Sequence, residues 1–284
     1  MNKILVPYDF SDVAKHALNF AAQIARKSKA ESVTLINIIE QPTPSDFKTM
    51  GVSNADPMEN IWIKKMIEKA EANMEAIMAD ESMKDIKLNY KIVLGNPFKE
   101  LAAEIETQGV KLVVMGTSGA SGAEEFFVGS NAERMVRYSK APVITVDHEA
   151  TLEAVNDIVF ASNFHEVSES FISHVKGLQS LFGAKLRLVK INTPASFTTT
   201  RQDKKQMEEF ISKHQLENCT YETYNHSNEE DGVLAYAEDV AADLIAIGTK
   251  QRRGLGHFLA GSIAEDVVNH AKVPVWTYGL ENES

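Results

Sequence analysis

The 284-residue sequence predicts an α/β fold made of two similar halves, each a parallel sheet with helices on both faces. Two observations lead to this prediction. Short apolar runs rich in β-branched residues, typical of buried strands, alternate with segments of helical spacing. The same series of patterns then recurs later in the chain. Alternating strands and helices form parallel sheets, because a helix makes the crossover between parallel strands.

The internal repeat keeps one register over most of each copy. The matched positions are Ile4 with Ile158, Leu112 with Leu244, Gly116 with Gly248, and Gly129 with Gly261. The spacing is 154 residues for the first pair and 132 for the others, so the second copy is shorter, mostly between its second and fourth strands. Each copy has the size of one ordinary domain, about 140 residues. We therefore predict domains at residues 1–147 and 155–284.

The first half opens with a strand and a helix. Residues 3–6 are apolar, and Pro7 ends the run. Ser11 suits the N-cap of the helix that follows, because its hydroxyl can accept a hydrogen bond from a free amide of the first turn. Apolar residues then recur at helical spacing over residues 14–25.

The second strand is expected at residues 33–39. The polar segment 40–57 that follows is long for a loop inside a domain, and such loops are either functional or disordered. The sequence leaves open whether it is a flap over a ligand or a disordered segment. The next helix is expected at residues 58–79, where one buried stripe comprises Ile63, Ile67, Ala70, Met74 and Ile77.

The third and fourth strands are expected at residues 86–94 and 110–115, with a helix between them. Asn96 suits the N-cap of this helix and Pro97 its first position, and Gly109 follows its last turn. A fifth strand completes the sheet near the end of the domain.

A glycine-rich segment follows the fourth strand, with Gly116, Gly119 and Gly129. Glycine lets a backbone come close to a ligand, and free amides at a helix N-terminus attract anions. Ser130 and Glu133 fit a capping box, which makes Ser130 the predicted N-cap of the next helix. Taken alone, the segment is also explained by an ordinary strand–loop–helix connection with a well-capped helix.

Asp9 provides a further reason to expect a ligand beside the glycine segment. In parallel sheets, ligands bind at the carboxyl ends of strands where the strand order reverses. Asp9 ends the first strand and Gly116 ends the fourth, so both face one crevice if these strands are neighbours. An ionised carboxylate accepts hydrogen bonds, which suits the hydroxyls of a ribose. The alternative is that Asp9 caps the helix that starts at Ser11.

These residues carry a family resemblance. Gly116, Gly119, Gly129 and Ser130 match the Gly-x2-Gly-x9-Gly-(Ser/Thr) pattern of the universal stress protein (UspA) family, and Pro7-Tyr-Asp9-Phe-Ser11 resembles its first-strand signature. The resemblance covers nearly all of the chain, which looks like a tandem two-domain member. It implies a Rossmann-like sheet of order 3-2-1-4-5 in each half, the adenine nucleotide alpha hydrolase-like fold. It also implies ATP, with Mg²⁺ or Mn²⁺ on the phosphates.

The resemblance further implies which residues meet the nucleotide. Asp9 contacts the ribose or adenine side, and Ile38 flanks the adenine with its backbone. The remaining expected contacts are Pro7 and Met115 with the base, Gly116 and Gly119 with ribose and phosphate, and Gly129, Ser130, Asn131 and Ala132 with the phosphates.

The second copy departs from this pattern. The replaced positions are Pro7 by Ala161, Asp9 by Asn163, and Gly119 by Gln251. A side chain at position 251 conflicts with a positive φ or a close backbone approach. We therefore expect one nucleotide per chain, in the first half. The basic residues Lys250, Arg252 and Arg253 are either a solvated cluster or a site for another anion.

Composition limits the class of protein. The chain is 44% hydrophobic and 24% charged, as soluble domains are, and its 29 basic against 40 acidic residues argue against nucleic-acid binding. No apolar run approaches the ~20 residues that cross a membrane, and the first strand leaves no room for a signal peptide. The single cysteine, Cys219, excludes an internal disulfide and fits a cytoplasmic location.

No catalytic machinery stands out. There is no Walker motif, and the eight histidines show no metal-binding spacing. The first hypothesis is an ATP-binding regulatory module in the stress response. The alternatives are a slow nucleotide hydrolase or phosphotransferase, and a nucleotide-free protein-interaction scaffold with an unknown partner.

The two halves are expected to form a pseudo-dimer. Strands at residues 142–146 and 274–278 are each the last of their sheet, and each leaves an unpaired edge that a partner strand can cover. The linker at about residues 147–155 is too short to let the halves drift apart. A homodimer of the whole chain is left open.

Overall fold

The computed structural model describes residues 2–40, 57–117, 129–165, 167–249 and 262–280. The long polar loop, Gly119, and the residues Lys250, Gln251, Arg252 and Arg253 lie outside the described residues. The predictions made for them therefore remain predictions.

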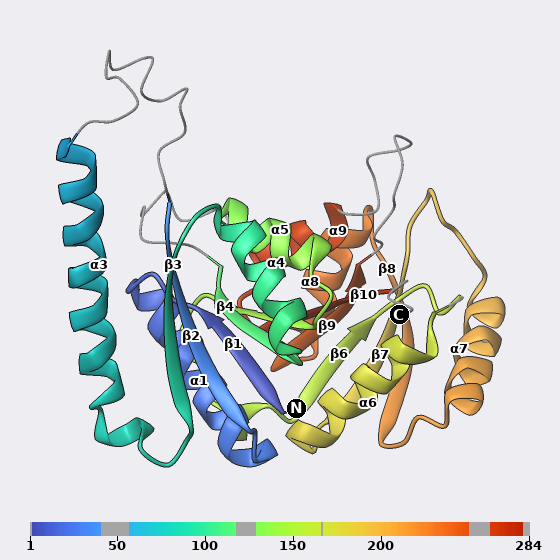
Figure 1. The fold of residues 1–284 in the computed structure, drawn as a ribbon. Coiled ribbons are helices and arrows are strands. Elements are labelled where there is room, and N and C mark those ends of the chain that lie inside the picture. The colour runs from blue at the N-terminus through green and yellow to red at the C-terminus, as the bar shows by residue number, and fades with distance from the viewer. Residues whose placement is uncertain (1, 41–56, 118–128, 166, 250–261, 281–284) are drawn as a thin grey trace.

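The first half contains the strands and helices that the sequence predicts, in the same order (Figure 1). They are β1 (Lys3–Pro7), α1 (Asp12–Ser28), β2 (Ser32–Ile39), α3 (Pro57–Met78), the short 3₁₀ helix η1 (Glu81–Met83), β3 (Leu88–Leu94), α4 (Pro97–Gln108), β4 (Leu112–Gly116), α5 (Ser130–Tyr138) and β5 (Val143–Val146).

The second half repeats this series after a linker that contains η2 (Leu152–Ala154). Its elements are β6 (Asp157–Ala161), α6 (Glu169–Phe182), β7 (Lys185–Asn192), α7 (Thr200–His214), β8 (Cys219–Asn225), α8 (Glu229–Asp239), β9 (Leu244–Thr249), α9 (Ser262–His270) and β10 (Val275–Gly279).

The ten strands in the described part of the chain form one sheet, in the order β3-β2-β1-β4-β5-β10-β9-β6-β7-β8. Each half thus has the order 3-2-1-4-5, and all pairs within a half are parallel. The two halves join through β5 and β10, which pair antiparallel with Ile144 opposite Trp276. The predicted pseudo-dimer through the fifth strands is confirmed within the chain, and it removes two exposed edges.

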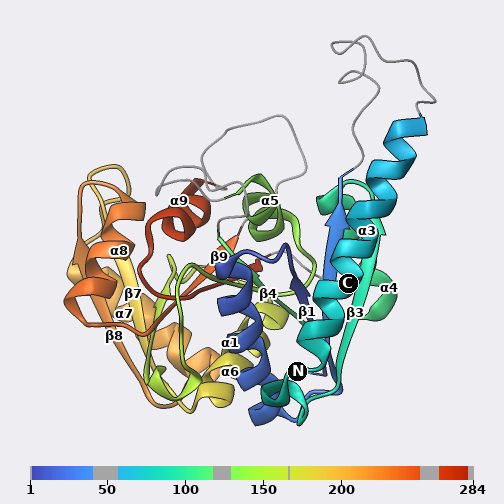
Figure 2. The same ribbon diagram turned by 90° about the vertical axis from the view of Figure 1, so that its left-hand side faces the viewer.

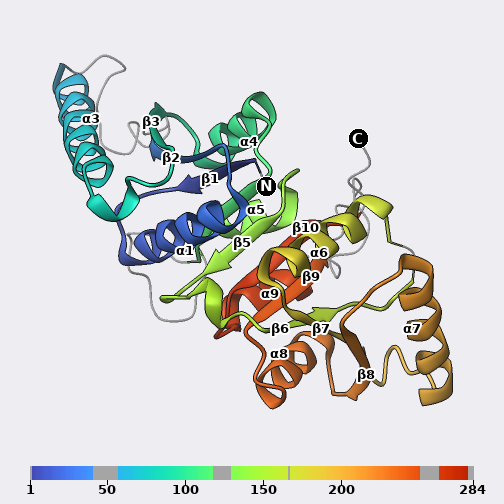
Figure 3. The same cartoon turned by 90° about the horizontal axis from the view of Figure 1, so that it is seen from below.

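Helices cover both faces of the sheet. Buried side chains of α1, α3, α6 and α7 pack on one face, and those of α4, α5, α8 and α9 pack on the other. Figure 3 shows the first face, with α1 and α6 in front of the sheet. The buried strands alternate sides: Leu35 belongs to the first core cluster and its neighbour Ile36 to the second.

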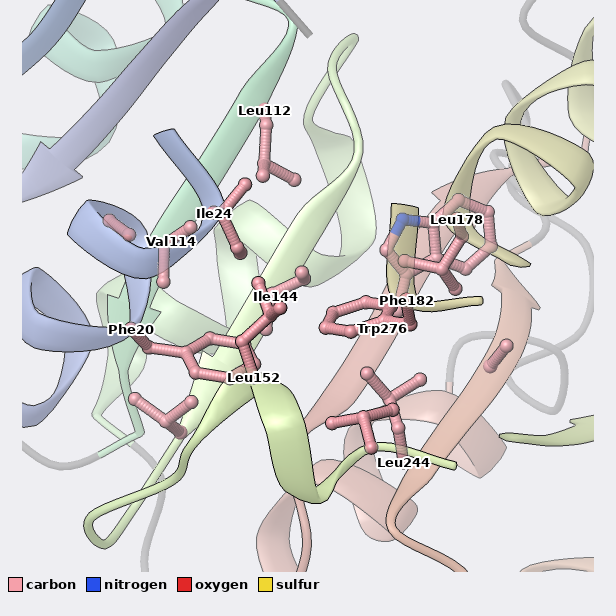
Figure 4. Packing of buried hydrophobic residues seen from close by; sticks show 14 of the residues in the cluster. Phe20, Ile24, Leu112, Val114, Ile144, Leu152, Leu178, Phe182, Leu244 and Trp276 are labelled. Carbon is pink, nitrogen blue, oxygen red and sulfur yellow. The ribbon is translucent and has the colours of Figure 1, made fainter. Parts of the chain in front are cut away.

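The junction between the halves is packed as tightly as a core. The rings of Phe20 and Phe182 stack 6.2 Å apart, and Trp276 is fully buried (Figure 4). The linker is held against α1, because Gln23 Oε1 accepts a hydrogen bond from the Leu152 backbone (2.8 Å). On the other face α5 and α9 lie side by side (Figure 2).

Local predictions mostly hold. Ser11 caps α1 by accepting from Ala14 N–H, and Asn96 caps α4 by accepting from Lys99 N–H. Gly109 ends α4 in the left-handed region at φ 62°. β3 and β4 each begin two residues later than predicted, at Leu88 and Leu112.

The predicted capping box at α5 is wrong. The N-cap is Gly129, with no side-chain cap hydrogen bond, and Ser130 is the first residue of the helix. The Gly129 carbonyl accepts from the N–H groups of Ala132 and Glu133 (2.8 and 3.2 Å). The helix therefore starts one residue earlier than the serine signal indicates, and its first turn is left without a side-chain cap.

Candidate functional site

The first half has a crevice where its strand order reverses, beside the end of β1. The β1–β2 ladder ends at Pro7 opposite Ile36, whereas β2 and β3 stay paired as far as Ile39 opposite Leu94. β2 therefore extends beyond β1. The carboxyl ends of β1 and β4 are neighbours, as the crevice prediction requires.

The extension of β2 presents backbone polar groups to this crevice. Tyr8 N–H donates to the Ile36 carbonyl (2.9 Å), which is the last backbone bond between the β1 end and β2. Every second residue of a strand directs its N–H and C=O to the same neighbour. Ile38 therefore directs one donor and one acceptor past the end of β1.

A cavity of about 280 Å³ occupies the crevice. Eight of the ten predicted site residues line it: Pro7, Asp9, Ile38, Met115, Gly116, Gly129, Asn131 and Ala132. Ser130 is not among the lining residues, and its side chain is exposed on the first turn of α5. Gly119 lies outside the described residues. Whether these residues bind a ligand stays a prediction.

Asp9 caps its own loop. The backbone N–H and the hydroxyl of Ser11 both donate to Asp9 Oδ1 (3.0 and 2.6 Å), and Ser11 in turn caps α1. The carboxylate is exposed and lines the cavity at the same time. The capping alternative raised by the sequence is therefore present in the structure, and it fixes the position of the carboxylate.

Several lining residues were not singled out from the sequence. Among them are Tyr8, Asn37, Glu40 and Thr117. Asn37 is buried and donates through Nδ2 to the Tyr8 carbonyl (2.8 Å), so it anchors the loop that carries Asp9. The available signal was a lone polar residue inside an apolar strand, which a buried hydrogen bond explains.

Gly116 is required by helix packing. A Cβ at this position would lie 2.8 Å from Val13 Cγ1 and 3.2 Å from the Val13 carbonyl carbon on α1. The sequence analysis explained this glycine by close approach of a ligand. The structure adds a reason that needs no ligand, so a substitution at Gly116 would disturb α1 as well as the cavity.

The ends of the glycine segment are joined. Gly129 N–H donates to the Thr117 carbonyl (2.7 Å), and Thr117 N–H donates to the Val146 carbonyl at the end of β5 (3.0 Å). These bonds hold the first turn of α5 over the carboxyl end of β4. The turn has no side-chain cap, so its dipole favours a negative group in the cavity.

One side of the cavity carries acidic side chains. Asp9 and Glu40 line it, and its described lining residues include no lysine, arginine or histidine. Burial raises the pKa of Tyr8, and the negative charges of Asp9 and Asp12 add to the effect. An anionic ligand would therefore rely on backbone amides, the helix dipole and an accompanying cation.

In the second half Leu280 packs at the end of β9, beside Gly248, which is the position equivalent to Gly116. A Cβ at Gly248 would lie 2.4 Å from Leu280 Cδ2, because the chain after β10 folds over the strand end. Leu280 N–H donates to the Thr249 carbonyl (2.8 Å) and holds this turn. Residues 250–261, which follow β9, lie outside the described residues.

The helix α8 packs closely on the end of β7. A Cβ at Gly232 of α8 would lie 2.5 Å from Ile191 Cγ2, so the helix packs directly on the strand end. The Ser196 hydroxyl donates to Glu229 Oε1 (3.2 Å), which joins the β7–α7 connection to the start of α8. In the first half Pro97 occupies the position of Glu229 and lines the cavity.

A buried ion pair replaces Asn37 in the second half. Lys190 takes its position on β7, and its Nζ lies 2.6 Å from Asp203 Oδ1 on α7, with both side chains almost fully buried. Thr198 also donates to Asp203 (2.6 Å). Burial alone would raise the pKa of Asp203, but hydrogen bonds from Lys190 and Thr198 outweigh it, and the pKa is lowered.

The described residues contain no group of three or more histidine, cysteine, aspartate or glutamate side chains placed to hold a metal ion. None of the described helices is both long and apolar enough to span a bilayer.

A doubly wound parallel sheet with a crevice at its switch point places this chain among the Rossmann-like α/β proteins. The model of the universal stress protein family matches residues 1–147 and 155–278. The chain therefore belongs to the universal stress protein family and carries two of its domains.

Known relatives agree with this assignment. Universal stress protein MJ0577 of Methanocaldococcus jannaschii is 31% identical over 152 residues, 51% of this chain and 93% of that protein. A putative universal stress protein of Staphylococcus aureus is 28% identical over 150 residues, 51% of this chain and 84% of its own length. The crystal structure of a universal stress protein from Archaeoglobus fulgidus aligns over 98% of both chains, with a TM-score of 0.73 at 22% identity, and so shares the fold.

Proposed function

We propose that the first half of this protein binds ATP and acts as a regulatory nucleotide-binding module. The observation that carries the proposal is the cavity beside β1, where the overhanging backbone of β2, the Asp9 carboxylate and the uncapped start of α5 face one space. These groups match the three parts of an adenine nucleotide in order: base, ribose and phosphates.

The base end is apolar with a polar edge. Pro7, Met115 and Ile38 supply apolar lining, and the Ile38 backbone offers one donor and one acceptor side by side. The edge of adenine carries a ring-nitrogen acceptor beside an amino donor, so it complements such a strand edge. This pairing supports adenine over bases with a different order of donors and acceptors.

The ribose and phosphates fit the other end. Asp9 accepts hydrogen bonds, and ribose hydroxyls donate them. The first turn of α5, with Gly129, Asn131 and Ala132 at the cavity, offers amides to phosphate oxygens. A divalent cation, Mg²⁺ or Mn²⁺, bound to the phosphates would offset their charge beside Asp9 and Glu40, and such ions keep much of their water shell.

We propose further that only the first half takes a nucleotide. The close contacts at the strand ends of the second half support this: Leu280 beside Gly248, Gly232 on Ile191, and the Ser196–Glu229 hydrogen bond. Asn163 in place of Asp9 and Gln251 in place of Gly119 act in the same direction.

Calorimetric titration with ATP and Mg²⁺ tests both statements. The expected result is a stoichiometry of one per chain and a stabilisation of about 2.7 kcal/mol at a hundredfold excess over Kd. No binding at millimolar ATP would refute the nucleotide proposal, and a stoichiometry near two would refute the asymmetry. Phosphate release well above the buffer rate would instead favour the hydrolase alternative.

A further inference from the structure

The second half has a cavity of its own, on a different side from the crevice. It measures about 250 Å³ and lies at the amino end of β9, where α8 and α9 end. Its floor is formed by the buried side chains of Ala237, Ala242, Ile245 and Ala271. The exposed residues Glu238, His270 and Lys272 stand at its mouth.

The internal repeat provides a reference for this cavity, because α4, α5 and β4 correspond to α8, α9 and β9 at a constant spacing of 132 residues. At the positions of Ala237 and Ala242 the first half has Ile105 and Val110, both buried. The second half therefore lacks the side-chain atoms that fill this floor in the first half.

The walls of the cavity carry larger apolar side chains than the equivalent positions of the first half. At the positions of Ala102 and Ala141 in the first half, the second half has Leu234 and Val273, which are partly buried and line the cavity. These larger side chains stand at the walls and not at the floor, so they do not fill the space that Ala237 and Ala242 leave. The surface is therefore concave and apolar in the second half, whereas Ile105 and Val110 occupy the equivalent place in the first half.

The mouth differs as well. In the first half Tyr138 packs edge-on against Phe98, with ring centroids 6.0 Å apart. His270 replaces Tyr138, and the position of Phe98 is Glu230, so this aromatic pair is missing from the second half. The ion pair at the rim is kept: Lys272 lies 3.4 Å from Glu238, as Lys140 lies 2.6 Å from Glu106.

We propose that this cavity is a second ligand site, for a neutral aromatic molecule of one or two fused rings. An apolar cavity of about 150 Å³ is enough to bind benzene in another protein, so 250 Å³ has room for a fused bicycle. The paired charges of Lys272 and Glu238 leave no net charge at the mouth to select an ion.

Indole is the probe for the test, titrated into the full chain with methyl-resolved NMR. The expected result is a saturable shift of the Leu234, Ile245 and Val273 methyl groups, with Leu101 and Met115 of the first crevice unmoved. Shifts confined to the first crevice, or no saturation up to the solubility of indole, would overturn the proposal. This measurement needs no variant.

A double substitution, Ala237→Ile with Ala242→Val, rebuilds the floor of the first half and serves as the matched variant. It should weaken indole binding at least tenfold while the unfolding temperature stays equal or rises. Undiminished binding in the folded variant would overturn the site. ATP binding to the first half should be the same in the variant and the parent, which separates this result from the proposed nucleotide function.

Discussion

The two halves have the same fold, the same helix order and the same overhang of the second strand beyond the first, yet different side chains meet at their strand ends. In the first half a cavity at this place is lined by residues from several elements. In the second half Leu280 packs beside Gly248 at the end of β9, and the β7–α7 connection is bonded to α8. The shared topology supplies the place for a ligand, and the side chains around it differ between the halves.

The two halves also differ in the polar contacts of their second strands, β2 and β7. Asn37 on β2 makes one neutral hydrogen bond, whereas Lys190 on β7 forms a buried ion pair with Asp203. A buried pair is sensitive to loss of one partner, because the remaining charge is left uncompensated. The two halves should therefore respond very differently to equivalent substitutions.

The largest expected effect is on stability in the second half. Asp203→Ala leaves the buried Lys190 ammonium unpaired and should lower the free energy of unfolding by about 3–5 kcal/mol. Asn37→Ala, at the position equivalent to Lys190, should cost only about 1–3 kcal/mol, for one unpaired carbonyl. Denaturant unfolding measures both. Equal losses would mean that the ion pair contributes no more than the neutral bond.

The next effect concerns phosphate in the first half. Asn131→Asp keeps the shape of the side chain and puts an acid in the first turn of α5, which the helix dipole tolerates. It should weaken ATP binding about a hundredfold, roughly 2.7 kcal/mol, through repulsion of the phosphates. Adenosine, which has no phosphates, is the control ligand and should bind equally to both proteins. A matching loss for adenosine would show that Asn131 lies elsewhere than at the phosphates.

The Asp9→Asn substitution gives the first half the residue type that the second half has at this position, Asn163. Asn163 Oδ1 accepts a hydrogen bond from His165 N–H, just as Asp9 Oδ1 accepts from Ser11 N–H, so the loop cap should survive. Loss of a charge-assisted bond to a ribose hydroxyl should weaken ATP about tenfold, roughly 1.4 kcal/mol. The reverse change, Asn163→Asp, should leave the stoichiometry of ATP at one. A second binding event in that variant would show that position 163 controls nucleotide binding in the second half.

A smaller effect on stability is expected at the two helix ends that precede β4 and β9, where the two substitutions should have opposite signs. Gly109 and Ala241 occupy the same place, both in the left-handed region, at φ 62° and 49°. Alanine is strained there, so Ala241→Gly should stabilise the protein by about 1 kcal/mol, and Gly109→Ala should destabilise it by a similar amount. Thermal unfolding of the two variants checks the signs. Destabilisation by Ala241→Gly would mean that chain entropy outweighs the strain.

The smallest effect is a pH dependence confined to the second half. Burial lowers the pKa of His214, against the opposing effect of Glu169, and its ring packs tilted against Phe210, with centroids 4.6 Å apart. The unfolded chain takes up this proton near pH 6.5 and the folded chain only at lower pH. Stability should therefore be flat above that pH and fall as the pH drops below it.

His214→Phe keeps the ring against Phe210 and removes the titrating group. Unfolding of this variant should lose less stability between pH 7.5 and 5.5 than unfolding of the parent protein does. An identical loss in both proteins would assign the acid sensitivity to other groups.

Much of the fold could be predicted from the sequence because its signals are local. Ser11, Asn96 and Gly109 are where cap chemistry puts them, and the repeat predicted both sheets and their junction. The N-cap of α5 was missed, because Ser130 and Glu133 match a capping box as letters while the backbone turns one residue earlier, at Gly129.

The repeat and the glycine pattern carried the family resemblance and the end of the sheet where a ligand would lie, and the resemblance implied the strand order. Only the tertiary structure decided that Gly116 makes room for Val13, that Asn37 holds the Asp9 loop, and that Leu280 packs beside Gly248. The physical reason is distance along the chain. Caps and periodicity act over a few residues, whereas Leu280 and Gly248 are 32 positions apart and Val13 and Gly116 are 103 apart, and only the folded sheet brings them into contact.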